Sequence, residues 1–289
     1  MTIDTTGRLA GKAILVAGAT GMAEAGATAF VSEGARVFVA ARTEATCVAL
    51  VERLNASGAS DEGPSGGVRA AYRTADLREE ASVVAVVADM RDRFGHVDGL
   101  FHVAGGSGRR FGDGPLHETS LDGWNETIRL NLTTQFLVAR EVVRSVLERR
   151  VEAAETQASV VLMGSVLGFH PAPGHFATHA YATSKAAVAG LVRAAAAYYA
   201  PDGIRFNAIA PGLVDTRMAA RAAQDPATVD YARRRQPLVH GLLDANDVAD
   251  LAVWLLSDAS RAVTGQVIGV DGGWGVSDAS GWSRLPGPV

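Results

Sequence analysis

A tyrosine and a lysine with a spacing suited to proton transfer stand at Tyr181 and Lys185. Residues four apart lie on one face of an α-helix, so both side chains point the same way if this segment is helical. A free tyrosine phenol titrates near pH ~10, and an ammonium about 4 Å away stabilises the phenolate by up to ~4 kcal/mol at an effective dielectric constant of about 20. The pair could therefore donate a proton near neutral pH.

Lysine is a rare choice in this chain. Arginine supplies 25 of the 27 basic residues, and Lys12 and Lys185 are the two lysines. A lysine ammonium is compact and its pKa shifts readily on burial, unlike that of a guanidinium. A solvated helix face would also tolerate this pair. Spacing and composition alone leave both interpretations open.

Short apolar runs alternate with helical segments along the whole chain. We expect seven strands, at residues 13–17, 36–40, 68–74, 99–103, 159–163, 205–209 and 265–270. The main helices are expected at residues 79–94, 121–150, 180–200 and 247–256. This alternation predicts an α/β fold, a doubly wound parallel sheet of the Rossmann type. No break in composition marks a second domain, so we expect one domain over residues 1–289, with residues 274–289 as a C-terminal tail.

Candidate binding residues fall where the expected strands end. Sheets of this class bind ligands at the carboxyl ends of their strands. Four such ends carry Gly18–Gly21, Ala104–Gly105, Ser165 and Pro211–Gly212. A strand, glycine turn, helix and strand within residues 13–40 also form a unit that can hold a pyrophosphate at the helix N-terminus.

Composition excludes several classes of function. A net charge of −4 is not the positive charge expected of a protein that binds nucleic acid, and no apolar run reaches membrane-spanning length. The N-terminus has no hydrophobic signal core, and the single Cys47 cannot form an internal disulfide. Three histidines within residues 170–179 lack ligand geometry, so we expect no metal. A cytoplasmic protein without nucleic-acid or membrane partners is the expectation.

Taken together, these motifs resemble the short-chain dehydrogenase/reductase family over nearly the whole chain. The family's Tyr-x-x-x-Lys pair matches Tyr181 and Lys185, its catalytic serine matches Ser165, and its catalytic asparagine matches Asn131. Further matches are Asn207-Ala208-Ile209-Ala210-Pro211-Gly212, Asp247-Val248-Ala249, Thr264-Gly265-Gln266 and Val270-Asp271-Gly272-Gly273.

The resemblance implies a role for each of these residues. Tyr181 would be the acid/base, Lys185 would bind the nicotinamide ribose and lower the pKa of Tyr181, and Ser165 would hydrogen-bond the reacting oxygen. Asn131 would hold a water on a proton path. The cofactor-binding residues implied by the same resemblance are Gly18, Thr20, Gly21, Met22, Arg42, Thr43, Asp76, Leu77, Ala104, Gly105, Tyr181, Lys185, Pro211, Gly212 and Val214.

Two cofactor-side motifs depart from the family pattern. Gly18 and Gly21 have two residues between them where the family usually has three. Ala23 replaces the third glycine, and we expect Glu24 beside it to turn outward to solvent. The family's Asn-Asn-Ala-Gly is replaced by His102-Val103-Ala104-Gly105, which removes side-chain hydrogen bonds that usually brace the central strands.

The end of the second strand indicates which dinucleotide is preferred. Relatives that use NAD usually carry an acid there, whereas this chain has Ala41, Arg42 and Thr43. A guanidinium can pair with the 2′-phosphate of NADP, so we expect NADP(H) to be preferred over NAD(H). A solvated arginine is the alternative. Asp76 is expected to bond the adenine amine.

The resemblance implies an oxidoreductase that interconverts a small-molecule carbonyl and a secondary alcohol. Two alternatives stay open: a non-redox relative that catalyses elimination or isomerisation, and a cofactor-poor binding or structural subunit. Relatives usually form homo-oligomers, so a tetramer or dimer is expected. Residues 107–117, 170–179 and 213–240 are expected to wall the substrate pocket. The arginines of these loops, Arg109, Arg110, Arg217 and Arg221, could attract an anionic substrate or simply be solvated.

Overall fold

One parallel sheet organises the computed structural model, which describes residues 7–56, 68–152 and 156–278. The sheet has seven strands in the order β3-β2-β1-β4-β5-β6-β7. Every neighbouring pair is parallel. The strands are β1 (Ala13–Ala17), β2 (Arg36–Ala41), β3 (Ala70–Thr74), β4 (Gly99–His102), β5 (Ala158–Met163), β6 (Ile204–Pro211) and β7 (Val267–Val270). The predicted fold class is confirmed.

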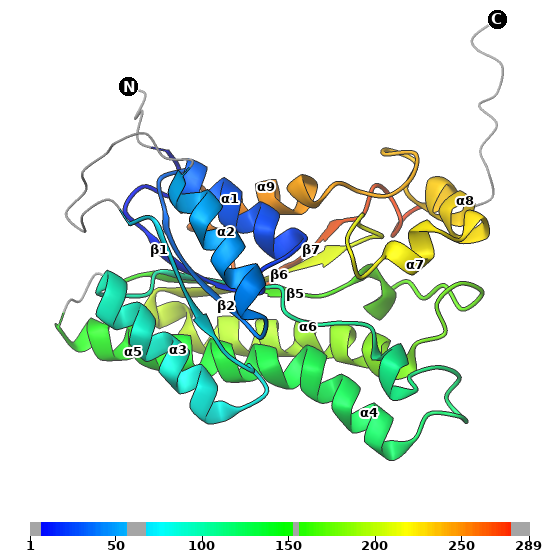
Figure 1. The fold of residues 1–289 in the computed structure, drawn as a ribbon, viewed down its shortest axis with the longest axis horizontal. Coiled ribbons are helices and arrows are strands. Elements are labelled where there is room, and N and C mark those ends of the chain that lie inside the picture. Colours follow the sequence, from blue (N-terminus) through cyan, green and yellow to red (C-terminus); the bar gives the residue numbers. More distant parts are fainter. Residues whose placement is uncertain (1–6, 57–67, 153–155, 279–289) are drawn as a thin grey trace, which may run out of the picture.

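Helices cover both faces of the sheet (Figure 1). One face carries α1 (Met22–Ser32), α2 (Glu44–Ala56) and α9 (Ala245–Leu256), and the other carries α3 (Glu80–Phe94), α5 (Thr134–Glu152) and α6 (His179–Tyr199). β1, β4 and β5 are buried along their whole length because both faces are covered. Two apolar cores result, one on each side of the sheet.

The strand order reverses between β1 and β4, and this reversal determines where a ligand can sit. The chain winds outward from β1 to β3, then crosses to β4 and winds the other way. The loops that follow β1 and β4 therefore separate at their carboxyl ends and leave a crevice. The glycine turn of residues 18–21 and the segment of residues 104–106 lie at that crevice.

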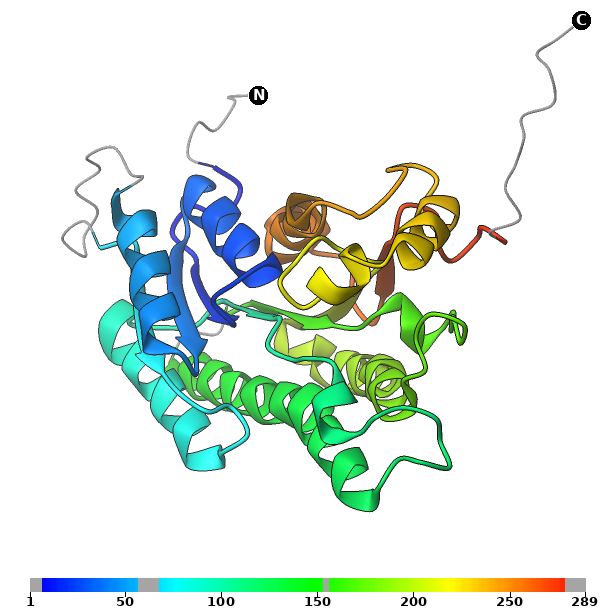
Figure 2. The ribbon, with the colours of Figure 1, turned by 45° about the vertical axis from the view of Figure 1, so that its right-hand side comes forward.

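The helix predicted for residues 121–150 is wrong in one respect. The structure has α4 (Leu121–Ile128), a π-helical turn (Arg129–Thr133) and then α5, which follow one another along the lower layer in Figure 2. Asn131 lies at the centre of the π-turn. Such turns insert one extra residue and often occur at functional sites.

Two short helices after β6 were not expected from the sequence. They are α7 (Ala220–Ala223) and α8 (Pro226–Arg235). The N-cap of α8 is Asp225, whose carboxylate accepts a hydrogen bond from Ala227 N.

The predicted C-terminal tail is described only as far as Asp278. Its first residue, Trp274, is buried against Val166 and Ala172. Residues 279–289 lie outside the described residues, and the single domain over residues 1–289 stays a prediction. Within the described ranges, none of the helices is long and apolar enough to cross a membrane.

Candidate active site

Two adjoining pockets at the carboxyl ends of the strands contain every catalytic and cofactor-binding residue predicted from the sequence. The first, a candidate catalytic pocket (called the catalytic pocket below), is lined by Asn131, Ser165, Tyr181, Lys185, Pro211, Gly212 and Val214 among others. The second, the glycine groove, is lined by Gly18, Thr20, Gly21, Arg42, Thr43, Asp76, Leu77 and Ala104 among others. Met22 and Gly105 line both, so the two pockets are continuous. Segments distant in sequence thus meet in one cleft.

The glycine turn has a backbone that suits a bound phosphate despite its shortened spacing. Gly18 and Gly21 both have positive φ, at 123° and 59°. A Cβ atom added to Gly18 would lie 2.9 Å from the Cβ of Ala23, so this position requires glycine. No side chain caps the N-terminus of α1, and Gly21, Met22 and Ala23 at this end of the helix line the groove. These features fit a dinucleotide pyrophosphate.

Glu24 does not obstruct this cradle. Its carboxylate forms an ion pair with Arg53 of α2, and its side chain is 41 % exposed. The outward orientation expected from the sequence is confirmed. The negative charge in the first turn of α1 is therefore neutralised on the outer surface, away from the groove.

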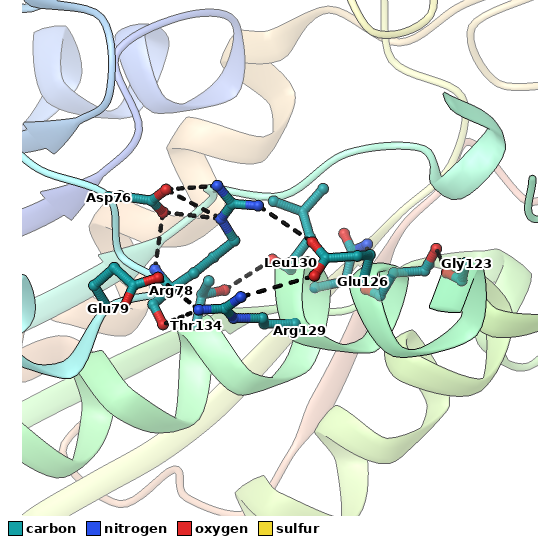
Figure 3. Close-up of polar contacts among 10 residues, drawn as sticks. Asp76, Arg78, Glu79, Gly123, Glu126, Arg129, Leu130 and Thr134 are labelled. Carbon is teal, nitrogen blue, oxygen red and sulfur yellow. Dashed lines mark hydrogen bonds and ion pairs between the residues drawn. The ribbon is translucent and has the colours of Figure 1, made fainter. Parts of the chain in front are cut away.

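The far end of the glycine groove carries a network of charges (Figure 3). The guanidinium of Arg78 donates to both carboxylate oxygens of Asp76, and its Nη2 lies 2.6 Å from Oδ2. These hydrogen bonds, with a smaller contribution from the charge of Arg42, lower the pKa of Asp76 to about 2. Arg78 also reaches Glu126 at 3.3 Å, and Arg129 joins Glu126 to Glu79. Asp76 is thus held ionised and fixed beside two guanidiniums.

The catalytic pocket brings Ser165, Tyr181 and Lys185 together from two elements. Ser165 follows β5 in extended backbone, and its Oγ accepts a hydrogen bond from Leu167 N at 3.2 Å. Lys185 is buried on α6, where its ammonium donates to the carbonyl of Met163 at 2.9 Å and lies 5.6 Å from the ring centroid of Tyr181. The α-helical spacing predicted for the pair is confirmed.

Burial shifts the pKa values of both Lys185 and Tyr181. It lowers the pKa of Lys185 to about 8, because an ammonium loses hydration inside the protein. It also raises the pKa of the Tyr181 phenol, and hydrogen bonding to Ser165 acts in the opposite direction. The expected lowering of the Tyr181 pKa by Lys185 is not seen: burial raises this pKa, and the opposing influence comes from Ser165.

A carboxylate from a distant loop caps the helix that carries the pair. Asp113, which is 3 % exposed, accepts three backbone N–H bonds of 2.9 Å each, from His179, Ala180 and Tyr181. The N-cap residue itself, Thr178, makes no side-chain capping bond. A buried carboxylate at a helix N-terminus satisfies orphan donors and complements the helix dipole. Asp113 therefore fixes the backbone of Tyr181 directly.

Asn131 and Gln135 brace the two strand ends that face the pocket. The Asn131 amide donates to Gly106 O and Thr127 O, and its Oδ1 accepts from Gly106 N at 3.0 Å. Gln135, one turn later, accepts from Met163 N and donates to Met163 O and Asn131 O. Both side chains are fully buried. The π-turn thus links the loop after β4 to the end of β5.

His102 takes the place of a bracing asparagine without making its bonds. It is the last residue of β4 and is fully buried, and neither ring nitrogen has a partner among the described residues. Burial, with the nearby charge of Lys185, lowers the pKa of His102 to about 3, so the imidazole is neutral. The loss of bracing predicted from the sequence is confirmed for this side chain.

The wall of the catalytic pocket is mostly apolar. Phe176, Leu213 and Met218 line it beside Trp274, whose indole donates to His170 O at 3.3 Å. Part of the predicted tail therefore covers the pocket. In the histidine-rich segment, the ring of His175 stacks on that of Tyr231, with 4.2 Å between the ring centroids. Among the described residues, no group of three or more His, Cys, Asp or Glu could hold a metal ion.

Sequence reasoning missed four residues that shape the site: Asp113, Gln135, Arg78 and Gln236. Buried Gln236 accepts from Leu213 N at 2.5 Å and donates to Gly241 O at 2.6 Å, which holds the loop after β6. The position of Gln135 one helical turn after Asn131 was a usable signal. Nothing local in the sequence relates Asp113 to α6 or Gln236 to Leu213.

Comparison with known proteins gives consistent matches over most of the chain. A family model described as enoyl-(acyl carrier protein) reductase matches residues 16–275. A curated relative, the 2,5-dichloro-2,5-cyclohexadiene-1,4-diol dehydrogenase of Sphingobium indicum, is 36 % identical over 228 residues, which cover 78 % of this chain and 86 % of the relative.

Two solved structures superpose closely. A short-chain type dehydrogenase/reductase from Mycobacterium ulcerans has a TM-score of 0.82 at 28 % identity and covers 93 % of this chain and 91 % of its own. A single-substitution variant of actinorhodin polyketide ketoreductase, solved with NADPH, has a TM-score of 0.78 at 30 % identity and covers 92 % of this chain and 97 % of its own.

Removing the carboxylate in Asp113→Ala should expose the first turn of α6. We expect the free energy of unfolding to fall by about 1–2 kcal/mol and the amides of residues 179–181 to exchange faster with deuterium. Asp244→Ala is the matched control, since Asp244 caps α9 through Asn246 N. It should lower stability while leaving exchange at residues 179–181 unchanged. Unchanged exchange in the Asp113 variant would show that the cap does not hold Tyr181.

Burial of neutral His102 should make stability depend on pH. The unfolded chain binds a proton on this histidine near pH 6.5 and the folded chain only near pH 3, so stability falls as the pH drops between those values. For each pH unit that the pH falls within this window, we expect the free energy of unfolding of wild type to decrease by about 1.4 kcal/mol more than that of His102→Leu. Denaturation at pH 7 and pH 5 measures the difference, with exposed His117→Gln as control. Parallel curves for wild type and His102→Leu would contradict the prediction.

Proposed function

This chain belongs to the short-chain dehydrogenase/reductase family, and on that premise we propose that it interconverts a carbonyl and a secondary alcohol using NADP(H). Membership makes the chain an NAD(P)-dependent oxidoreductase that acts on a small molecule. The observation that carries the finer proposal is the convergence of Ser165, Tyr181 and Lys185 in a pocket continuous with the glycine groove. A binding or structural subunit would not need this set.

The glycine groove is proposed to hold the dinucleotide. Gly18, Thr20 and Gly21 would approach the pyrophosphate, and Asp76 with Leu77 would border the adenine. Lys185, Pro211, Gly212 and Val214 would border the nicotinamide half. When bound, NADP(H) would supply or accept the hydride that changes the oxidation state of the substrate carbon.

Tyr181 is proposed to move the proton. Its phenol would protonate the oxygen of a carbonyl substrate, or take the proton of an alcohol in the reverse direction. Ser165 would donate a hydrogen bond to the same oxygen and stabilise the charge that develops on it. The Lys185 ammonium, with a pKa of about 8, is mainly protonated at neutral pH and would bind the nicotinamide ribose.

Asn131 is proposed to act mainly by holding other groups in position. Both hydrogens of its amide already bond protein carbonyls, at Gly106 and Thr127. The water expected from the sequence would therefore bind its main-chain carbonyl, which accepts from Gln135 and keeps a second lone pair. In this way Asn131 would connect the Lys185 ammonium to solvent.

Preference for NADP(H) over NAD(H) is supported by the charges at the adenosine end. Arg42 lines the groove after β2, where no acid stands, and Arg78 adds a second guanidinium. Arg78 is held by Asp76 and Glu126, whereas no ion pair fixes Arg42 among the described residues. A 2′-phosphate could therefore pair with Arg42 in a fork geometry. The related polyketide ketoreductase was solved with NADPH.

We also propose a homo-oligomer and a cytoplasmic location. The outer face of α6 is exposed and small at Gly190, Ala194 and Ala197, which suits close packing against a second copy. Light scattering of the purified protein measures the oligomeric state, and a monomer would refute the first proposal. Cell fractionation tests the second.

Replacing the phenol in Tyr181→Phe tests the central assignment. We expect kcat to fall by about 100- to 10,000-fold, because the proton donor is lost, while the affinity for NADPH is retained. Exposed Tyr198→Phe on the same helix is the matched control and should keep wild-type turnover. Wild-type rates in Tyr181→Phe would refute the acid/base role. Cofactor binding without hydride transfer in wild type would point to a non-redox reaction, and no cofactor binding to a binding subunit.

Replacing Arg42 tests the cofactor preference. Arg42→Met should weaken binding of NADPH by about tenfold or more and leave NADH affinity nearly unchanged, because only NADPH carries the 2′-phosphate. Fluorescence titration of both nucleotides measures this ratio. Arg73→Met, which breaks an ion pair with Asp89 outside the groove, is the control. Equal weakening of both nucleotides would contradict the phosphate contact.

A further inference from the structure

The mouth of the catalytic pocket carries positive charge that the proposed reaction does not use. Arg109 and Arg221 both line the pocket, one from the loop after β4 and the other from α7. They are far apart in sequence and converge on one pocket. Neither belongs to the glycine groove, so they are not placed to meet the phosphates of a dinucleotide.

No acid in the pocket balances these two guanidiniums. The described residues that line it include no Asp or Glu. Arg109 donates to the carbonyl of His175 at 3.3 Å. Neither Arg109 nor Arg221 forms an ion pair with any described residue. Arg8, Arg78 and Arg149 pair with acids, whereas Arg109 and Arg221, like Arg42 and Arg110, have no ion pair among the described residues.

One acid, Asp113, acts on Arg109. Its charge raises the pKa of Arg109, while its oxygens accept the three N–H bonds at the start of α6. Burial and the charge of Arg221 act in the opposite direction and lower the pKa of Arg109. Arg109 and Arg221 line the same pocket and repel each other, and a bound anion would relieve this repulsion.

The rest of the pocket wall is mainly apolar. Leu213, Phe176 and Met218 line it together with the two arginines and the Ser165–Tyr181 pair. A substrate that fills the pocket would thus present a carbonyl to the reacting groups, an apolar body to the wall and an anion to the arginines. A neutral substrate would leave the two guanidiniums unpaired.

Resting on the proposed function, we propose that the substrate is a small apolar keto or hydroxy acid whose carboxylate binds Arg109 and Arg221. A carboxylate matches a guanidinium in paired, charge-assisted hydrogen bonds. Arg109 and Arg221 then determine which carbonyl compounds are accepted, and Ser165 and Tyr181 act on the carbonyl. The enzyme would then select carbonyl compounds by the negative charge at the end of the substrate away from the reacting carbonyl.

Binding of two matched probes tests this proposal without requiring turnover. Calorimetry compares cyclohexanecarboxylate with cyclohexanecarboxamide, with and without NADP⁺. We expect the carboxylate to bind about tenfold or more tightly than the amide, and this preference to collapse in Arg109→Met and Arg221→Met. Arg110→Met is the matched control, since Arg110 is exposed over the Phe111 ring and does not line the pocket. Equal affinity for the two probes, or a preference that survives both substitutions, would overturn the proposal.

Inorganic phosphate separates a substrate site from a simple anion site. Phosphate lacks an apolar body, so it should bind more weakly than cyclohexanecarboxylate. Phosphate binding as tight as the carboxylate would also overturn the assignment.

Turnover separates this inference from the proposed reaction. NADPH-dependent reduction of 4-oxocyclohexanecarboxylate is compared with that of its methyl ester, and the ratio of the two kcat/KM values should fall about tenfold in either arginine variant. Reduction of both ketones without charge preference would leave the proposed reaction standing and refute the acid site. Charge-selective binding without reduction of any ketone would support the site and refute the reaction.

Discussion

The three hydrogen bonds that Asp113 accepts from the first turn of α6 hold this active site together. The carboxylate is buried and comes from the loop after β4, whereas the helix begins at His179, far along the chain. Without this cap, the first N–H groups of the helix would lack acceptors, and the backbone of Tyr181 would be free to fray. The same contact ties the loop of Arg109 to the helix of Lys185. The position of the phenol and the shape of the pocket rim therefore depend on one side chain.

Asp113 also contributes to the electrostatics of the cleft. Its charge raises the pKa of Arg109, but the carboxylate does not line the pocket, so the lining carries more positive than negative charge. Elsewhere in the pocket, the Lys185 ammonium is held by the carbonyl of Met163, and its burial lowers its pKa. The chain is acidic overall, yet the charged side chains that line its catalytic pocket are cationic. Such a pocket favours anions and developing negative charge.

The cofactor side shows how the fold tolerates an altered motif. The shortened turn keeps positive φ at Gly18 and Gly21, and Glu24 turns to Arg53. His102 makes no bracing bond, whereas Asn131 bonds Gly106 in both directions and holds the loop after β4. The buried, unpaired imidazole is the remaining cost of this change within the described chain.

The sequence by itself determined the parallel sheet, the strand ends and the Tyr181–Lys185 face, because alternating patterns, glycine turns and helical spacing are local properties of the chain. It also determined the outward turn of Glu24 and the loss of bonds at His102. Only the tertiary structure decided the π-turn at Asn131, the higher pKa of Tyr181, the cap from Asp113 and the meeting of Arg109 with Arg221. These features arise from burial and from contacts between segments distant in sequence. No local pattern encodes which side chains will be desolvated or brought together when the sheet closes its core.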